Sequence, residues 1–517
     1  MNSTSFLILL GIVLYAGVFL LPFSFASNDD SLMMGLLDGS YTGEPEGYVV
    51  FLHPILSEGT SFLYRLYNDF PWYPVLWFLF SFLSYVAFVL AVGTRRYTWS
   101  HQLMWIVLYL LFSLQQLFLL QFTVVAGISA FSGYMLLFEA QRFPYKRLVG
   151  KETFASFLII VSILVRTEAF FLVTIGCGSF LLLKYGLFHC IALLRKNVGL
   201  LLIGMALIGY VPIYEKKFGY EEYATFTRTR SKVIDHPVFW YITPQIDKEA
   251  RPDLFFFRNW LFEDNPAVNI SFLEQTKGQL DGGYFSPGYF LYSLQRIMDF
   301  HKHHNFALFT TFCYIFLLVL IDSPKRENLK FCFLWVAFFL VFNHFFLVPH
   351  RVQSLFELTI LGAAWLCRRK IALQPNVLLL TVSIILGLFI VHVLRITQAL
   401  NSKEKIISEV EFITELIPRQ TVSFTDLIGI KHLDPRIPSH EESRYIYFGW
   451  HSRSPMQAKA LERFGYGELR EIKVFYYLTM RNNKLVIPEY LSYLKREEFK
   501  REFVASTGDF LLFKYSK

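Results

Sequence analysis

The sequence predicts an α-helical polytopic membrane protein of about 11 transmembrane helices, with a small α/β domain at its C-terminus. Two observations predict this class. Hydrophobic residues make up 54% of the 517 positions and charged residues only 17%, a balance typical of membrane proteins and not of soluble chains of this length. Apolar runs of about 20 residues, enough to cross a hydrocarbon core of about 30 Å, also recur along the chain.

The apolar runs define the predicted spans. The first run, Phe6 to Ala26, lacks the basic segment that precedes a cleaved signal sequence, so we expect it to remain as a transmembrane helix. The predicted spans are 5–26, 73–93, 103–121, 123–138, 153–166, 169–184, 198–214, 305–321, 330–348, 354–367 and 376–397. The fifth and sixth are short and flank Arg166-Thr167-Glu168, which leaves open whether they are two ordinary helices or a bent, incompletely spanning pair.

Short clusters of Lys and Arg predict the orientation. The clusters are Arg95-Arg96, Arg142 with Lys146-Arg147 and Lys151, Lys184 with Arg195-Lys196, Lys325-Arg326 and Arg368-Arg369-Lys370. With a cytoplasmic N-terminus, every cluster falls on the cytoplasmic side, as the positive-inside rule requires. The three long polar segments, 27–72, 215–304 and 398–517, then all lie outside. Because the basic residues sit in these clusters, the net charge of +8 is a topology signal, and we expect no nucleic-acid partner.

The chain after residue 398 differs in composition from the rest. It begins with a charged, helix-like stretch from Lys403 to Ile417 and continues with alternating stretches, among them Ile472 to Leu478. Two apolar stretches around a Ser-Thr-Gly-Asp turn predict a terminal hairpin that ends near Tyr515. We therefore divide the chain into a transmembrane domain, 1–397, with outside loops 27–72 and 215–304, and an extracytoplasmic α/β domain, 398–517.

The loop after the first span carries residues suited to acid–base chemistry. Asn28-Asp29-Asp30 lies within a residue or two of the predicted membrane surface. Desolvation and an adjacent like charge both raise the pKa of a carboxyl group, which suits Asp29 or Asp30 to accept a proton or to hold a Mg²⁺ or Mn²⁺ ion. The alternative interpretation is that Asn28-Asp29-Asp30 only ends the helix and faces water. Glu44 and His53 follow in the same loop and are candidate contacts for an acceptor.

Charged residues near the predicted ends of spans are candidate ligands for a phosphate. Arg166 and Glu168 interrupt an apolar segment, where an unpaired charge is costly and usually faces a cavity or a partner. An arginine beside a glutamate suits a lipid-phosphate site, and an internal ion pair is the alternative. His350 and Arg351 follow the ninth span, where the guanidinium group is suited either to bind a phosphate or to extend towards the interface.

The second outside loop adds further charges on the predicted outer face. Arg228, Arg230 and Asp235 lie close together in the sequence. We expect them to contact an acceptor, with a solvated basic stretch as the alternative.

This pattern resembles the GT-C superfamily of membrane glycosyltransferases. In that superfamily a catalytic acid follows the first span, later outside loops and an arginine near a span end hold a polyprenyl-phosphate sugar, and an outside C-terminal domain is frequent. Four motifs more closely resemble a group of bacterial membrane proteins from surface-polysaccharide gene neighbourhoods. The motifs are Gly39-Ser40-Tyr41-Thr42-Gly43, Phe70-Pro71-Trp72-Tyr73, Arg230-Ser231-Lys232 with Asp235, and Phe257-Arg258-Asn259-Trp260.

The resemblance implies an inverting glycosyltransferase in the bacterial cytoplasmic membrane, with its N-terminus cytoplasmic and its C-terminus outside. It would move a sugar from a polyprenyl-phosphate donor to a glycan, lipid or protein acceptor on the extracytoplasmic face. Asp29 or Asp30 would be the catalytic acid, and Arg166 with Glu168 and Arg351 would hold the donor phosphate. The alternative is a polysaccharide polymerase or ligase, or a flippase-like transporter, but a transporter should carry polar residues near the middle of several spans.

Overall fold

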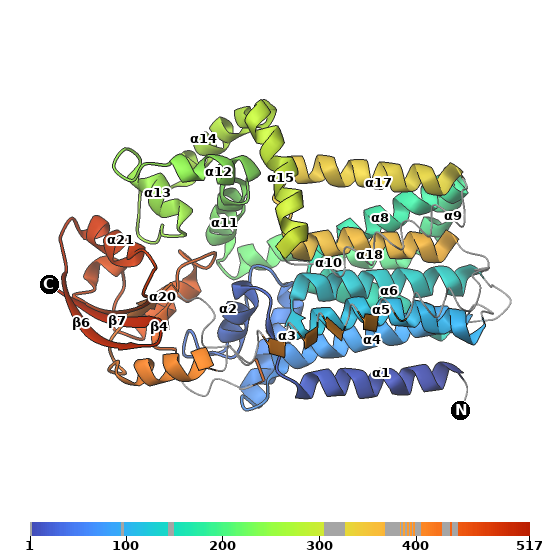
Figure 1. Cartoon of the computed structure of the whole chain (residues 1–517), viewed down its shortest axis with the longest axis horizontal. Coiled ribbons are helices and arrows are strands. Elements are labelled where there is room, and N and C mark those ends of the chain that lie inside the picture. Colours follow the sequence, from blue (N-terminus) through green and yellow to red (C-terminus); the bar gives the residue numbers. More distant parts are fainter. Residues whose placement is uncertain are drawn as a thin grey trace.

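The apolar runs form a bundle of helices that lie side by side in the computed structural model (Figure 1). The structure describes residues 3–94, 98–142, 149–303, 326–367, 405–426, 435–436 and 443–517, with scattered positions between 383 and 398. The bundle helices are α1 (Ser3–Leu20), α4 (Trp72–Thr94), α5 (Trp99–Phe118), α6 (Phe122–Arg142), α7 (Val149–Val165), α8 (Thr167–Tyr185), α10 (Val198–Lys217), α17 (Arg326–Phe345) and α18 (His350–Cys367).

Helices occupy the positions of the predicted spans wherever the structure describes them. The spans from 5–26 to 198–214, together with 330–348 and 354–367, each coincide with one bundle helix. Among the described residues, five helices (α1, α4, α6, α8 and α10) are long and apolar enough to cross a membrane. The predicted spans 305–321 and 376–397 lie outside the described residues, apart from scattered helical positions in the second. The same holds for the clusters Arg95-Arg96, Lys146-Arg147 and Arg368-Arg369-Lys370, and for Lys325.

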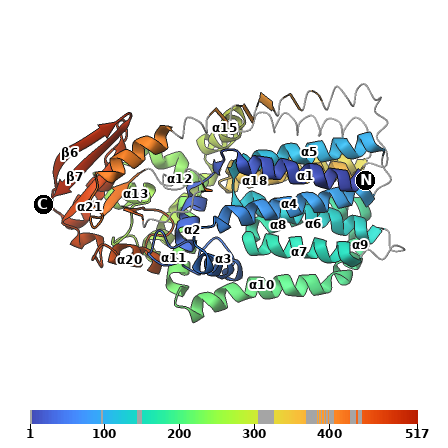
Figure 2. The same ribbon diagram turned by 90° about the horizontal axis from the view of Figure 1, so that it is seen from below.

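Arg166 alone separates α7 from α8. Its backbone is extended, with φ −160° and ψ 102°, so the helix stops and starts again at this residue. Because α8 is long enough to span by itself, two separate helices are favoured over one bent pair. After α8, the short α9 (Leu187–Lys196) leads into α10 at the end of the bundle where the N-terminus lies (Figures 1 and 2).

The polar segments gather at the opposite end of the bundle, with the C-terminus (Figure 1). The first segment contains α2 (Asn28–Leu37) and α3 (Pro54–Leu66). The second contains α11 (Glu221–Ile234), α12 (Pro237–Ile242), α13 (Pro252–Arg258), α14 (Ile270–Asp281) and α15 (Pro287–His303), with 3-10 turns at Thr243–Gln245 and Gly282–Phe285. The bundle therefore separates its N-terminus from the three polar segments, as the charge pattern predicts.

A short parallel strand pair fixes where α2 begins. β1 (Ser24–Phe25) pairs with β2 (Leu119–Leu120), which directly precedes α6. The N–H of Ala26 also donates to the carbonyl of Leu120 at 2.9 Å. The chain leaving α1 is thereby tied to the start of α6, and the first turn of α2 must lie beside it.

The C-terminal region folds around a mixed five-stranded sheet. The strands are β3 (Ser423–Thr425), β4 (Tyr445–Ile446), β5 (Val474–Met480), β6 (Lys500–Thr507) and β7 (Phe510–Ser516), in the order β4-β3-β5-β7-β6. β3 pairs in parallel with β4 and β5, whereas β7 is antiparallel to β5 and β6. The β6–β7 pair confirms the predicted terminal hairpin. The region also contains α20 (Pro455–Glu462), α21 (Val486–Lys495) and a 3-10 turn at Leu469–Glu471.

The C-terminal region docks on the turn that follows α2. Gly39 has φ +83°, and a Cβ there would lie 2.6 Å from the backbone nitrogen of Pro45, so this tight turn requires glycine. The turn presents Tyr41, which is 2% exposed, to the C-terminal region. Its hydroxyl donates to Gln457 Oε1 at 2.7 Å. The Gly39–Gly43 motif therefore acts as a docking element.

Candidate functional site

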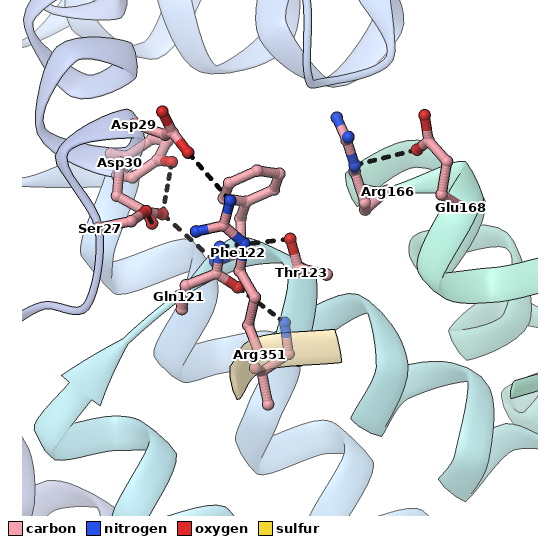
Figure 3. Close-up of polar contacts among 11 residues, drawn as sticks. Ser27, Asp29, Asp30, Gln121, Phe122, Thr123, Arg166, Glu168 and Arg351 are labelled. Carbon is pink, nitrogen blue, oxygen red and sulfur yellow. Dashed lines mark hydrogen bonds and ion pairs between the residues drawn. The ribbon is translucent and has the colours of Figure 1, made fainter. Parts of the chain in front are cut away.

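Asp29 and Arg351 form an ion pair between two segments that are far apart in the sequence. Arg351 Nη2 lies 3.5 Å from Asp29 Oδ2, and the side chains are 28% and 24% exposed (Figure 3). Asp29 belongs to the first turn of α2 and Arg351 to the first turn of α18. The pair is long and partly open to solvent, so both groups are available to a ligand.

Asp30, the next residue, is fully enclosed. Its Oδ1 accepts hydrogen bonds from the hydroxyl of Tyr73 at 3.0 Å and from the N–H of Phe122 at 3.2 Å. Its Oδ2 accepts from the hydroxyl of Ser27 at 3.0 Å. Burial is the largest influence and raises the pKa of Asp30 to about 7. Because both of its oxygens have protein partners, Asp29 is the carboxylate of this pair that faces the solvent.

Arg166 faces the same region from the junction of α7 and α8. Its Nε lies 2.9 Å from Oε2 of Glu168, whose side chain is 72% exposed, and an ion pair this exposed contributes little to stability. The guanidinium carbon lies 4.9 Å from the ring centre of Phe51 and 5.6 Å from that of Phe122. Phe122 also donates its N–H to Asp30, so the start of α6 contacts both groups (Figure 3).

Arg230 is a buried guanidinium whose hydrogen-bonding capacity is not fully used. Its side chain is 2% exposed, and its guanidinium carbon lies 5.1 Å from the ring of Trp260 and 5.8 Å from that of Phe262. Within the described part of the chain, Nε and Nη1 have no hydrogen-bond partner. Burial lowers the pKa of Arg230. A buried cation with unused donors is suited to bind an anion.

Asp235, at the C-terminal end of α11, interacts electrostatically with the charged residues just described. Its side chain is exposed, yet desolvation by the surrounding protein raises its pKa. The carboxyl group of Asp235 is thus open to water on one side and faces protein on the other. The charges that act on it are those of Arg230, Arg351, Asp29 and Arg166, in that order. We call this group of five charged residues the charged recess.

Four helices begin at the charged recess. α2 begins at Asn28, α6 at Phe122, α8 at Thr167 and α18 at His350, each within two residues of a group just described. A helix N-terminus carries a partial positive charge and N–H groups without an intrahelical partner, so it favours anions. The first N–H of α6 already donates to Asp30. The recess is therefore suited to bind an anionic group, with the accessible carboxylates of Asp29 and Asp235 beside it.

The other predicted site residues have different surroundings. His350 lies half-buried at the first position of α18, beside Arg351. Arg228 Nη1 pairs with Glu215 Oε2 at 2.9 Å, and residues two apart on a helix do not share a face, so it points away from Arg230. The structure thus brings Arg230 into the recess but not Arg228.

The predicted acceptor contacts in the first loop also lie elsewhere. His53 caps α3: its Nδ1 accepts from the N–H of Ile55 at 3.2 Å, and its Nε2 donates to the carbonyl of Leu207 at 2.9 Å. Both ring nitrogens are therefore used, and burial lowers the pKa of His53. Glu44 is exposed in the turn beyond the C-terminal end of α2, away from Asp29 at the other end. The structure does not bring His53 or Glu44 into the charged recess.

The acidic pair offers few ligands to a divalent metal. Among the described residues, no group of three His, Cys, Asp or Glu side chains could hold one. Asp30 uses both oxygens in hydrogen bonds, and Asp29 faces Arg351. Mg²⁺ is usually held by one or two carboxylates, with water and substrate phosphate completing its coordination, so within the acidic pair Asp29 is the residue left to hold the metal ion considered from the sequence.

Several contacts of the site had no sequence signal that pointed to them. Tyr73 belongs to the Phe70–Tyr73 motif, but nothing in that motif indicates a bond to Asp30. Phe51 and Phe122 look like ordinary apolar residues, yet both rings lie against Arg166. Only an arginine at membrane depth, which needs a partner, could have indicated that aromatic rings would be near.

The fold and recess define a polytopic helical membrane protein with a cluster of charged residues at one end of its bundle. No protein-family model matches the chain, and no curated protein sequence matches it. The chain is similar to the crystal structure of ArnT from Cupriavidus metallidurans bound to undecaprenyl phosphate, at 12% identity and a TM-score of 0.43. It is similar to the apo state of the same protein at 9% identity and a TM-score of 0.41. Each match covers 99% of this chain and 97% of the other.

Proposed function

We propose that the protein is an inverting GT-C-type glycosyltransferase that moves a sugar from a polyprenyl-phosphate donor to an acceptor hydroxyl. The observation that carries the proposal is the partly accessible Asp29–Arg351 pair in a recess with two further arginines and four helix N-termini. The guanidinium groups of the three arginines can bind a phosphate, and the carboxylate of Asp29 can take a proton from an acceptor hydroxyl. The recess would face the extracytoplasmic side of a bacterial cytoplasmic membrane, because Arg195-Lys196 and the N-terminus lie at the other end of the bundle.

Asp29 is the proposed general base. Its carboxylate would take the proton of the acceptor hydroxyl as the hydroxyl oxygen attacks the anomeric carbon of the donor sugar. The bond between that carbon and the phosphate oxygen breaks, and the polyprenyl phosphate leaves with the electron pair. One displacement from the face opposite the phosphate inverts the anomeric carbon.

The three arginines of the recess would stabilise the leaving phosphate. Negative charge grows on the phosphate as the glycosidic bond breaks, so fixed guanidinium groups stabilise the transition state more than the bound donor. Arg351 and Arg166 are partly exposed and would meet the phosphate first. Arg230 has unused donors and lies deeper. Asp30 would act as a positioning residue, because its hydrogen bonds fix the first turn of α2 and thus the place of Asp29.

An apolar cavity within the helix bundle supports a lipid-linked donor. It has a volume of about 520 Å³ and lies among α6, α7, α8, α9 and α10, on the side of the bundle where α7 and α10 run next to one another (Figure 2). Ile163 and Phe170, which line it, lie within about one helical turn of Arg166 on either side. A prenyl chain whose phosphate occupies the recess could therefore enter this cavity.

The proposal is tested by assaying sugar transfer from defined polyprenyl-phosphate sugars by the purified protein. Asp29→Asn should lower the rate by roughly 10²–10⁴-fold, the usual contribution of a general base. Asp30→Asn should lower it less, because the amide can keep most of the hydrogen bonds. Full activity in both variants would refute the assignment of the acids. If the wild type transfers nothing but moves lipid-linked glycan across liposomes, the enzyme class itself is wrong.

A further inference from the structure

We propose that a loop of the C-terminal region, residues 449–454, holds two arginines of the charged recess in place, and that Arg453 is a positioning residue for Arg230. The inference rests on the proposed function, because it concerns the affinity of the recess for the donor phosphate. It assigns to the C-terminal region a direct part in substrate binding.

Arg453 holds the segment 262–265 of the second outside loop. Its backbone N–H donates to the carboxylate of Glu263. Its guanidinium group donates from Nε to the carbonyl of Phe262 at 3.1 Å and from Nη2 to the carbonyl of Asn265, and the guanidinium carbon lies 4.6 Å from the ring of Phe226. Arg453 has φ +63°, a conformation that is uncommon without compensating contacts. These bonds fix a backbone that has no regular secondary structure of its own.

The fixed segment carries part of the surface against which Arg230 lies. Phe262 and Trp260 are the two rings next to its guanidinium group, at 5.8 Å and 5.1 Å. Since Nε and Nη1 of Arg230 have no hydrogen-bond partner among the described residues, ring contacts are the main restraint on the plane of the guanidinium group. Arg453 therefore acts on Arg230 through Phe262, without belonging to the recess itself.

The same loop reaches Arg166 by a second route. The carbonyl of Trp450 accepts a hydrogen bond from Tyr223 on α11 at 3.0 Å. The ring of Trp450 lies 4.9 Å from that of Phe51, and Phe51 in turn lies 4.9 Å from the guanidinium carbon of Arg166. One loop thus supports an arginine on each of two sides of the recess.

The loop is itself anchored to the first outside segment. His451 is buried, with Nε2 2.9 Å from the carbonyl of Tyr447 and 3.1 Å from the hydroxyl of Tyr41. Tyr41 follows α2, whose other end carries Asp29. A shift of the C-terminal region would therefore move the supports of both arginines together, and we expect donor affinity to depend on this contact.

A double-mutant cycle tests the role of Arg453. The probe is undecaprenyl phosphate, and the readout is its dissociation constant with the purified full-length protein. Arg453→Ala and Arg230→Ala should each weaken binding roughly tenfold or more, the usual effect of losing a charged hydrogen bond. The double variant should bind no more weakly than Arg230→Ala alone, because the two residues act through one group. Arg453→Lys, which preserves the charge but cannot bond two carbonyls in a fork, should lie between wild type and Arg453→Ala.

Two controls separate this role from general destabilisation. Arg453→Ala combined with Arg351→Ala should be additive, since Arg351 is held by Asp29 and not by the loop. Arg501→Ala, on the exposed edge strand β6 of the same sheet, should leave binding unchanged. Additive effects of Arg453→Ala and Arg230→Ala, or unchanged binding in Arg453→Ala, would overturn the inference and leave the proposed function intact. If the wild type binds no undecaprenyl phosphate, both proposals fail.

Discussion

At the scale of single residues, Asp29 and Asp30 illustrate how adjacent identical side chains acquire different roles. Neighbouring residues on a helix point about 100° apart, so the first turn of α2 places one carboxyl group in the protein and the other at the recess. Asp30 accepts three hydrogen bonds and is fully buried, whereas Asp29 is partly open and faces Arg351. The sequence contains no signal for this difference, because it depends on where α4 and α6 pack.

Asp29→Asn should separate catalysis from binding. Removal of the carboxylate charge eliminates the proposed base but also frees Arg351 for the phosphate, so the turnover should fall while undecaprenyl phosphate binds as tightly as before or a few-fold more tightly. Arg351→Gln should do the opposite and weaken binding by roughly tenfold or more. Dissociation constants and single-turnover rates of both variants check this contrast. Weaker lipid binding in Asp29→Asn than in Arg351→Gln would contradict it.

Asp30 should make stability depend on pH. Its pKa is raised from an ordinary value of 3.8 to about 7, so the folded protein holds the proton where the unfolded chain has lost it. The free energy of unfolding should therefore fall as the pH rises from about 4 to about 7, and then level off. Asp30→Asn, which resembles the protonated form, should remove the contribution of Asp30 to this decrease in the free energy of unfolding.

Thermal unfolding of wild type and Asp30→Asn in the same detergent at pH 5, 6, 7 and 8 measures the effect. Glu263→Gln is the matched control. Burial raises the pKa of Glu263 to about 8, so the fall in the free energy of unfolding that Glu263 causes should extend to a higher pH than the fall that Asp30 causes. An identical pH dependence in wild type and Asp30→Asn would show that Asp30 does not keep its proton.

At the scale of elements, helix N-termini and short connections shape the site. The spans themselves follow from apolar length alone, which explains why their positions could be predicted from the sequence. The two-residue strands β1 and β2 could not be predicted from the sequence, because strands this short have no periodicity to detect. Yet their pairing determines where α2 starts relative to α6, and hence how Asp30 meets Phe122.

The cavity among α6 to α10 should select for the lipid chain of the donor. Gly178 lines it, and a Cβ at this position meets nothing within 4 Å, so Gly178→Leu should fill space without disturbing the fold. We expect this variant to use a donor with a long prenyl chain several-fold less well than wild type, but a short-chain donor equally well. The ratio of kcat/KM for the two donors is the measurement.

Gly17→Leu on α1 is the control for the cavity variant, since a Cβ at Gly17 also meets nothing within 4 Å and Gly17 does not line this cavity. It should leave the ratio unchanged. An equal loss with both donors in Gly178→Leu, or the same change in Gly17→Leu, would mean that the cavity does not hold the chain.

At the scale of the whole molecule, three polar segments that are separate in the sequence meet at one end of the bundle (Figure 1). The sequence predicted this common side, because the charge clusters between spans leave a single consistent topology. It could not predict the contacts that make the recess. Asp29 and Arg351 are 322 positions apart, and their meeting depends on the packing of α18 against α6 and α8.

The docking of the C-terminal region on the turn after α2 should contribute to stability. Tyr41→Phe removes the hydroxyl that donates to Gln457 and leaves buried polar groups without a partner, which costs about 1–3 kcal/mol. We expect a lower unfolding temperature and weaker binding of undecaprenyl phosphate. Tyr476→Phe, on β5 of the same region but half-buried, is the control and should change neither. Normal lipid binding in Tyr41→Phe would indicate that the recess does not depend on this contact.

The most direct test of the central claim is to locate undecaprenyl phosphate bound to the full-length protein by electron cryo-microscopy. The proposed function predicts density for the phosphate in the charged recess, within hydrogen-bonding distance of Arg351 and at least one of Arg166 and Arg230, with the chain continuing towards α8 and α10. Asp29 should face the side of the phosphate where the sugar would lie. A phosphate bound away from Arg351, with the recess filled by water alone, would contradict the account.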